Sequence, residues 1–150
     1  MSKGPVIVGV DDSTFTTALE VARGIARQYD LPLLYAHVVD RTERAGHVER
    51  AVHDVGASHG AEVAIEHGHP ADRLVELSRE REASFLVLGN HGPRSSLLGS
   101  ISADVSRRAA CPVVVVPPTV EHDAHDMPPR SSFEGGLAGF ELGNPIRTAA

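Results

Sequence analysis

The stretch FLVLGNHGPRSSLLGSISADVSRRAACPVVVVP, residues 85–117, carries the pattern that decides the fold of this chain. It contains two short apolar segments, at 85–89 and 112–117, each typical of a β-strand that is covered on both faces. Between them, apolar residues recur at every fourth position, which predicts a helix over 99–110. Two strands joined through a single helix must run parallel, so this stretch is one turn of a parallel α/β sheet.

The same alternation of strand and helix continues toward the N-terminus. Apolar, β-branched segments predict three further strands, at 5–11, 33–39 and 62–67. Residues with apolar spacing of three and four predict helices after each of them, at about 14–29, 46–59 and 70–78. The predicted buried stripe of the first helix is Phe15, Leu19, Ala22, Ala26 and Tyr29.

Turn-forming residues fit the ends of these helices. Pro32 follows the first helix and disfavours helical backbone in the residue before it, Gly60 suits a C-terminal cap, and Pro70 suits a first helical turn. The order β-α-β-α-β-α-β-α-β predicts an α/β fold over residues 1–117. This fold is an open, doubly wound, parallel five-stranded sheet with helices on both faces.

Residues 118–150 differ in composition from the rest of the chain. They are rich in Gly and Pro and contain five acidic and two basic residues, which supply −3 of the net charge of −6. We predict a C-terminal extension that is largely disordered or docked without regular structure. Its scattered apolar residues leave a second interpretation open, a segment that contacts a protein partner.

Composition excludes several classes of partner and location. Lys3 is the only lysine and the net charge is −6, which argues against nucleic acid, and no apolar run approaches the ~20 residues of a membrane helix. The N-terminal stretch is too short and too interrupted for a secretory signal. The single Cys111 cannot form an internal disulfide, fits a reducing compartment and is expected to be a buried structural thiol. We therefore expect a cytoplasmic protein with no membrane partner.

The carboxyl ends of the strands are where an open α/β sheet binds its ligands. Of the segments expected there, 10–14 and 88–100 have specialised sequences. The second has glycines where the backbone bends or approaches a ligand, and Gly99-Ser100 opens a helix whose free N–H groups suit a phosphate. Asn90 adds a polar side chain. The same residues would also serve an ordinary strand-to-helix turn, so both interpretations stand at this point.

Other kinds of site find less support. Neither the P-loop spacing nor the dinucleotide fingerprint is present. Asp11-Asp12 resembles the acidic pair of receiver domains, but the Asp and the Lys that such domains need after their third and fifth strands are missing. Two histidine pairs, at 67/69 and 122/125, bring no third ligand by spacing, so no metal site is predicted. No arrangement of nucleophile and base is implied, so no catalytic residue is predicted.

Four successive segments together resemble the universal stress protein family: VIVGVDDS, AHVV, GHPADRLVELSREREASFLVLGNHG and LLGSISADVSRRAACPVVVV. The resemblance covers about residues 3–117. Members that bind ATP share the motif G-x2-G-x9-G-[ST], to which Gly89, Gly92 and Gly99-Ser100 correspond. Only six residues separate Gly92 from Gly99, where the family motif has nine. Either the outer part of the loop is shorter, or Gly99-Ser100 is drawn away from the phosphate position.

The resemblance implies the function and the remaining site residues. It implies a stress-response switch or regulator that binds ATP or a related adenine nucleotide, with Mg²⁺, and is no enzyme beyond slow ATP hydrolysis. Asp11 would contact ribose or adenine and Val38 would pack against adenine. The other candidate nucleotide-binding residues are Gly9, Val10, Leu88, His91 and Ile101. The family also implies a homodimer through the edge strand Val113–Val116. The alternative is a nucleotide-free dimeric scaffold or adaptor of the same fold.

Overall fold

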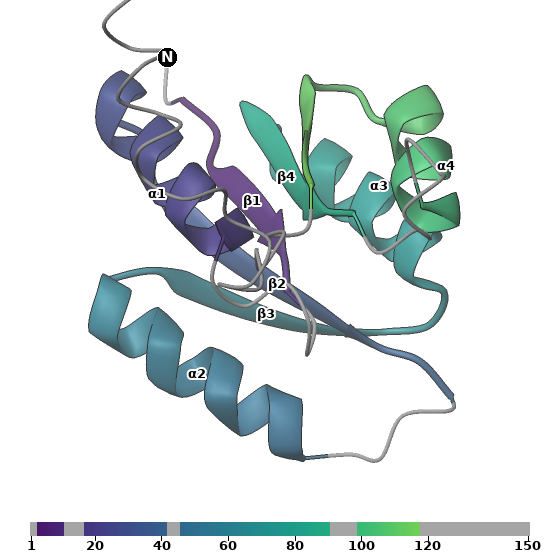
Figure 1. Ribbon diagram of the computed structural model, residues 1–150, viewed down its shortest axis with the longest axis horizontal. Helices are drawn as coiled ribbons and strands as arrows, with labels where there is room; N and C mark the ends of the chain where they lie inside the picture. The colour runs from purple at the N-terminus through teal and green to yellow at the C-terminus, as the bar shows by residue number, and fades with distance from the viewer. Residues whose placement is uncertain (1–2, 11–16, 42–45, 91–98, 118–150) are drawn as a thin grey trace, which may run out of the picture. The chain divides into compact units, whose positions relative to one another are not determined.

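The computed structural model describes residues 3–10, 17–41, 46–90 and 99–117, and the structural statements below concern these residues. Strands and helices alternate along them (Figure 1). The elements are β1 (Val6–Gly9), α1 (Thr17–Tyr29), β2 (Leu33–Val39), α2 (His47–His59), β3 (Glu62–His67), α3 (Pro70–Glu80), β4 (Phe85–Gly89), α4 (Ser100–Arg108) and β5 (Val113–Val116).

The five strands form one parallel sheet in the order β3-β2-β1-β4-β5. Helices α1 and α2 cover one face of this sheet, and α3 and α4 cover the other (Figure 1). The chain winds outward from β1 to β3, then returns past β1 to β4 and continues to β5. This confirms the predicted doubly wound fold, and it places the reversal of winding between β1 and β4.

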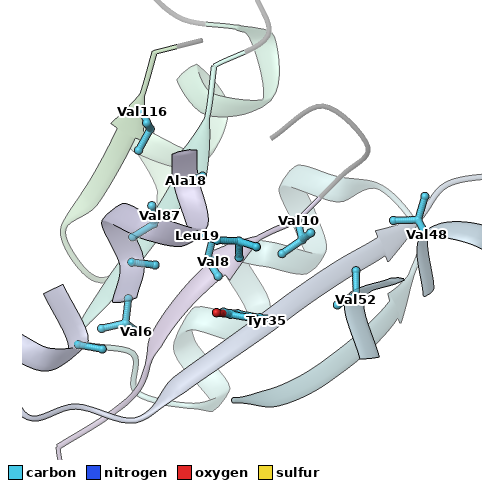
Figure 2. Packing of buried hydrophobic residues seen from close by; sticks show 12 residues of the cluster. Val6, Val8, Val10, Ala18, Leu19, Tyr35, Val48, Val52, Val87 and Val116 are labelled. Atoms are coloured by element: carbon cyan, nitrogen blue, oxygen red, sulfur yellow. The ribbon is translucent and has the colours of Figure 1, made fainter. Parts of the chain in front are cut away.

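The strands are apolar because both faces of the sheet are buried, and successive side chains alternate between the two faces. Val6, Val8 and Tyr35 lie under α1 and α2 (Figure 2), and all three are fully buried. Ile7 and Leu34 point to the opposite face and pack against α3 and α4. The core therefore consists of two apolar layers, one on each side of the sheet.

The ends of the helices agree with the predicted turn residues. Gly60 caps α2 with a left-handed backbone (φ 65°), and Pro70 occupies the first turn of α3. Asp30, directly after α1, also has a left-handed backbone (φ 53°) that places Pro32 in line with the start of β2. The first and last strands are shorter than predicted, since the paired residues are only Val6–Gly9 and Val113–Val116.

Tyr29 differs from the prediction. It was expected in the buried stripe of α1, but its side chain is 53% exposed. Tyr29 is the last residue of the helix, and its ring packs against the ring of Phe85 in a tilted arrangement, with 5.5 Å between the ring centres. Leu19, Ala22 and Ala26 are buried as predicted, and Phe15 lies outside the described residues, as does the extension 118–150.

Candidate functional site

The carboxyl ends of β1 and β4 meet at the point where the winding of the sheet reverses. The two strands pair in register, and Gly9 and Gly89 are their last residues. Ligand crevices of open α/β sheets lie at this point. The segments that follow, 11–16 and 91–98, lie outside the described residues, and with them the predicted site residues Asp11, His91 and Gly92.

Asn90 fastens the start of α4 to the end of β4. Its side chain is buried (7% exposed), and its Oδ1 accepts a hydrogen bond from the backbone N–H of Gly99 at 2.7 Å. Its own backbone N–H donates to the carbonyl of Val116 at 2.8 Å. The two ends of the segment 91–98 are therefore held together, and both lie at the carboxyl edge of the sheet.

A second hydrogen bond strengthens this junction. The buried hydroxyl of Ser102, in the first turn of α4, donates to the carbonyl of Gly89 at 3.3 Å. The first hydrogen bond within the helix runs from the N–H of Ala103 to the carbonyl of Gly99. The backbone N–H groups of Ser100 and Ile101 therefore precede the helical ladder, and they form the positive end of α4 at this edge. The first turn of α4 contains no acidic residue to compete with an anion there.

The predicted site residues fall into two groups. Gly99, Ser100 and Ile101 lie at the start of α4, with Ser100 exposed and Ile101 41% exposed. The second group is apolar and forms the floor of the site, that is, the part of the core that lies beneath the carboxyl edge of the sheet. The exposed fractions are 5% for Val10, 9% for Val38 and 4% for Leu88.

Gly9 has a packing reason as well as a place at the edge. A Cβ at Gly9 would lie 2.9 Å from Cδ2 of Leu88 and 3.4 Å from Cδ1 of Leu74. A side chain at this position would displace the apolar floor. The glycine therefore allows the side chains of Leu88 and Leu74 to pack directly against the end of β1.

His37 is a buried polar residue of this edge that the sequence did not single out. It is 2% exposed, and its Nδ1 lies 2.8 Å from the carbonyl oxygen of Val10, to which a protonated Nδ1 donates. The bond joins the ends of β2 and β1. A histidine inside the apolar strand LLYAHVV is the signal that would have identified it.

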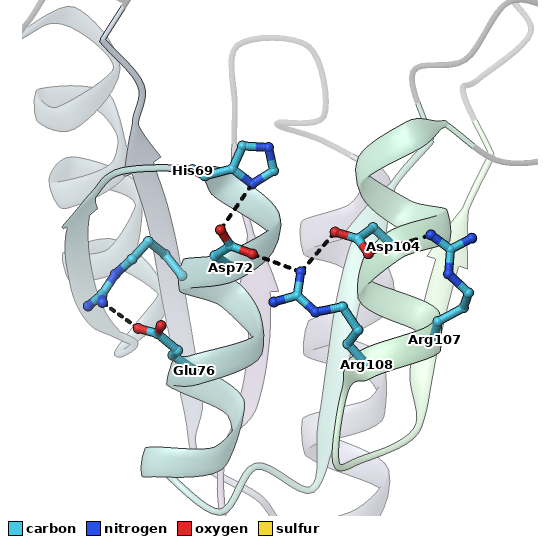
Figure 3. Close-up of polar contacts among 7 residues, drawn as sticks. His69, Asp72, Glu76, Asp104, Arg107 and Arg108 are labelled. Atoms are coloured by element: carbon cyan, nitrogen blue, oxygen red, sulfur yellow. Dashed lines mark hydrogen bonds and ion pairs between the residues drawn. The ribbon is translucent and has the colours of Figure 1, made fainter.

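A surface network of ion pairs joins α4 to α3 (Figure 3). The guanidinium of Arg108 lies 2.8 Å from a carboxylate oxygen of Asp72 on α3 and 2.9 Å from one of Asp104 on α4. The hydrogen bonds that Arg108 donates to the carboxylates of Asp72 and Asp104 raise its pKa. These side chains are partly exposed to solvent, so the network orients α4 more than it stabilises the domain.

Within the described ranges, no three His, Cys, Asp or Glu side chains lie close enough to share a metal ion. None of the helices in the same part of the chain has the length and apolar character to span a membrane.

Comparison with known proteins identifies the family. The sequence model of the universal stress protein family matches residues 47–117. A universal stress protein of Mycobacterium tuberculosis (strain H37Rv) is 41% identical over 86 residues, which is 55% of this chain and 53% of the relative. The chain thus matches about half the length of this curated relative.

Solved structures extend the match over the whole described domain. A crystal structure of a universal stress protein in complex with cAMP is 31% identical, with a TM-score of 0.64, over 79% of this chain and all of that one. A universal stress protein from Archaeoglobus fulgidus, in complex with dAMP, shares the fold at 23% identity and a TM-score of 0.56, over 77% of this chain and 98% of that one. This chain belongs to the universal stress protein family.

Proposed function

We propose that this protein binds an adenine nucleotide, ATP with Mg²⁺ in particular, at the carboxyl edge between β1 and β4, and acts as a cytoplasmic stress-response switch. The observation that carries this proposal is the hydrogen bond from Gly99 to Asn90, which holds the N-terminus of α4 at the reversal point of the sheet. The relative that is 31% identical was crystallised with an adenine nucleotide, which supports the choice of ligand.

The phosphates are assigned to the start of α4. The N–H of Gly99 is already donated to Asn90, so the phosphate donors in this proposal are the N–H groups of Ser100 and Ile101 and the Ser100 hydroxyl. Because Asn90 and Gly99 are in contact, the six-residue spacing does not draw Gly99-Ser100 away from β4. This supports the interpretation in which only the outer part of the loop is shorter. Asp11, His91 and Gly92 keep the roles that the family resemblance implies.

We further propose that the nucleotide is held rather than turned over. The floor of the edge is apolar, and the buried polar groups described there, His37 and Asn90, are engaged with backbone atoms. A general base needs a free acceptor within reach of the attacking water. Phosphate release is expected to be at most slow, as the family resemblance implies.

A variant at Ser100 separates binding from folding. An aspartate at this position, Ser100→Asp, stabilises the start of α4 through the helix dipole but repels a phosphate. We expect at least a tenfold loss of MgATP affinity by calorimetry, with an unfolding temperature equal to or above that of the wild type. Ser100→Asn, which has the size of aspartate but no charge, is the matched control. Its NH2 group can donate in place of the hydroxyl, so it should bind within about threefold of the wild type.

Two outcomes would overturn the proposal. One is that mass spectrometry finds no nucleotide in the purified full chain and calorimetry shows no heat with MgATP or cAMP. The other is an unchanged affinity in Ser100→Asp. The first result favours the nucleotide-free scaffold, whose function lies in contacts with a protein partner. The second would place the nucleotide away from the start of α4. Phosphate release well above background would instead contradict the switch without turnover.

We also propose a homodimer through β5. This strand is an edge of the sheet and consists of four valines, without a charge to prevent pairing. The opposite edge, β3, carries Glu62 and Glu66, which pair with Arg81 and Arg73. Charged side chains of this kind block edge-to-edge association. Of the two edges, β5 is therefore the one suited to pair with a second copy of the chain.

A further inference from the structure

A pocket of about 300 Å³ lies at the opposite, amino edge of the sheet, between the C-terminal ends of α1 and α2. Its walls come from α1, from the connection into β2 and from His59-Gly60 at the end of α2. The volume is at the lower end of the range for small-molecule sites. β2 has seven residues and spans about 20 Å, so the pocket is distinct from the carboxyl edge.

Two arginines of α1 line this pocket without an internal counter-ion. Arg23 and Arg27 form no ion pair or hydrogen bond within the ranges that the structure describes. Other arginines of the same domain do: Arg73, Arg81 and Arg108 each contact a carboxylate. Residues one helical turn apart lie about 6 Å from each other at Cβ, so the two guanidinium groups can hold one oxyanion between them.

His59 also lines the pocket, beside the two arginines. Its Nδ1 lies 2.7 Å from the hydroxyl of Tyr35, which fixes the ring. Burial, followed by the charges of Arg23 and Arg27, lowers the pKa of His59. The ring is therefore neutral beside two cations at neutral pH, and a bound anion would reverse this effect.

We propose that this pocket is an anion site that takes a small phosphate-bearing or carboxylate ligand between Arg23, Arg27 and His59, separate from the nucleotide site. Asp30, the one acidic side chain among the lining residues, and the negative C-terminal ends of α1 and α2 oppose the anion, so the two guanidinium groups must outweigh them. The helix dipole favours a cation in the last turn of a helix, which explains Arg27 at the end of α1. Arg23 lies a full turn earlier, where the dipole does not favour a cation.

The experiment uses inorganic phosphate as the probe and the full chain. Phosphate replaces chloride at constant ionic strength while the His59 ring and the Gly60 amide are followed by NMR. We expect saturable shifts at both and a rise in the pKa of His59. Arg23→Gln and Arg27→Gln should each weaken phosphate binding about tenfold, the loss expected for one charge-assisted hydrogen bond.

Three matched variants sharpen the test. Asp30→Asn removes the opposing charge and suits the left-handed backbone of this residue, so it should tighten phosphate binding without loss of stability. Arg79→Gln, also in the last turn of a helix, should leave binding unchanged. Ser100→Asp should not affect the shifts at His59, which separates this site from the proposed nucleotide site.

Non-saturating shifts in the wild type would overturn the proposal. So would equal phosphate affinity in the wild type, Arg23→Gln and Arg27→Gln, because the phosphate would then be held elsewhere. A weaker affinity in Asp30→Asn would also contradict it, since the sign of the electrostatic effect would be wrong.

Discussion

At the scale of a single residue, the side chain of Asn90 holds the start of α4 at the proposed site. An amide accepts through Oδ1, as Asn90 does from Gly99, and donates through its NH2 group, whereas a carboxylate only accepts. A buried side chain that satisfies a backbone N–H is costly to remove, because the partner loses its acceptor. Asn90 is thus expected to act as a positioning residue for the start of α4.

Two substitutions at Asn90 should have different effects. Asn90→Ala removes the acceptor, and we expect a loss of about 1–2 kcal/mol in the free energy of unfolding together with weaker MgATP binding. Asn90→Asp keeps the acceptor but adds a negative charge near the proposed phosphates, so MgATP affinity should fall more than stability does. Urea unfolding and calorimetry on the same preparations measure both. If Asn90→Ala keeps wild-type stability and affinity, the hydrogen bond has no positioning role.

His59 gives the domain a pH dependence whose sign follows from its surroundings. Because burial and then Arg23 and Arg27 lower its pKa, the unfolded chain takes up a proton at this ring at a higher pH than the folded chain. This contribution to stability is therefore complete above about pH 7, and it is lost as the pH falls below the unfolded value of about 6.5.

The variant His59→Asn isolates this contribution. Asparagine retains an acceptor near the position of Nδ1 for the Tyr35 hydroxyl but does not titrate. We expect the free energy of unfolding of the wild type to fall more steeply between pH 7.5 and pH 5.5 (roughly one unit on each side of the unfolded value) than that of the variant. Parallel curves from urea titrations would show that His59 has no part in the pH dependence.

At the scale of the element, the glycines inside α1 and α2 have different surroundings. A Cβ at Gly56 of α2 would lie only 2.3 Å from Cγ2 of Val63, so the glycine permits the contact of α2 with β3. A Cβ at Gly24 of α1 would have no atom within 4 Å. The same residue type therefore has a packing role in one helix and none in the other.

The matched substitutions Gly24→Ala and Gly56→Ala test this difference. Alanine is favoured over glycine by about 1 kcal/mol in a helix interior, so Gly24→Ala should raise the free energy of unfolding by about that amount. Gly56→Ala gains the same propensity but forces α2 away from Val63, and a net loss of about 1–2 kcal/mol is expected. Stabilisation of both variants in urea unfolding would contradict the close packing of α2.

At the scale of the whole molecule, the bare β5 edge should set the oligomeric state. Pro112 and Val116 accept hydrogen bonds from β4 through their carbonyls, so by the period of two the N–H of Val115 points to the open edge. Val115→Pro removes that donor without disturbing β4 and should convert a dimer to a monomer in sedimentation velocity. Val115→Thr, which keeps the N–H, is the control. A dimer that persists in Val115→Pro would place the interface elsewhere.

The sequence predicted the fold well because its signals are local and repeated. The apolar runs, the helical spacing, Gly60 and Pro70 each report on a few neighbouring residues, and parallel α/β topology follows from their order. The site was harder to predict, since its central contact joins Asn90 to a residue nine positions later, with no periodic signal. The amino-edge pocket combines α1 with the end of α2, and no motif marks it.

The hydrogen bond between Asn90 and Gly99 has a consequence for protein engineering. It holds the start of α4 at β4 from outside the segment 91–98, so the position of α4 should depend little on the length of that segment. Closing a longer segment costs only about 0.6 kcal/mol for each doubling of its length. This universal stress protein could therefore accept a grafted recognition peptide or reporter between residues 92 and 99 and display it from a rigid base.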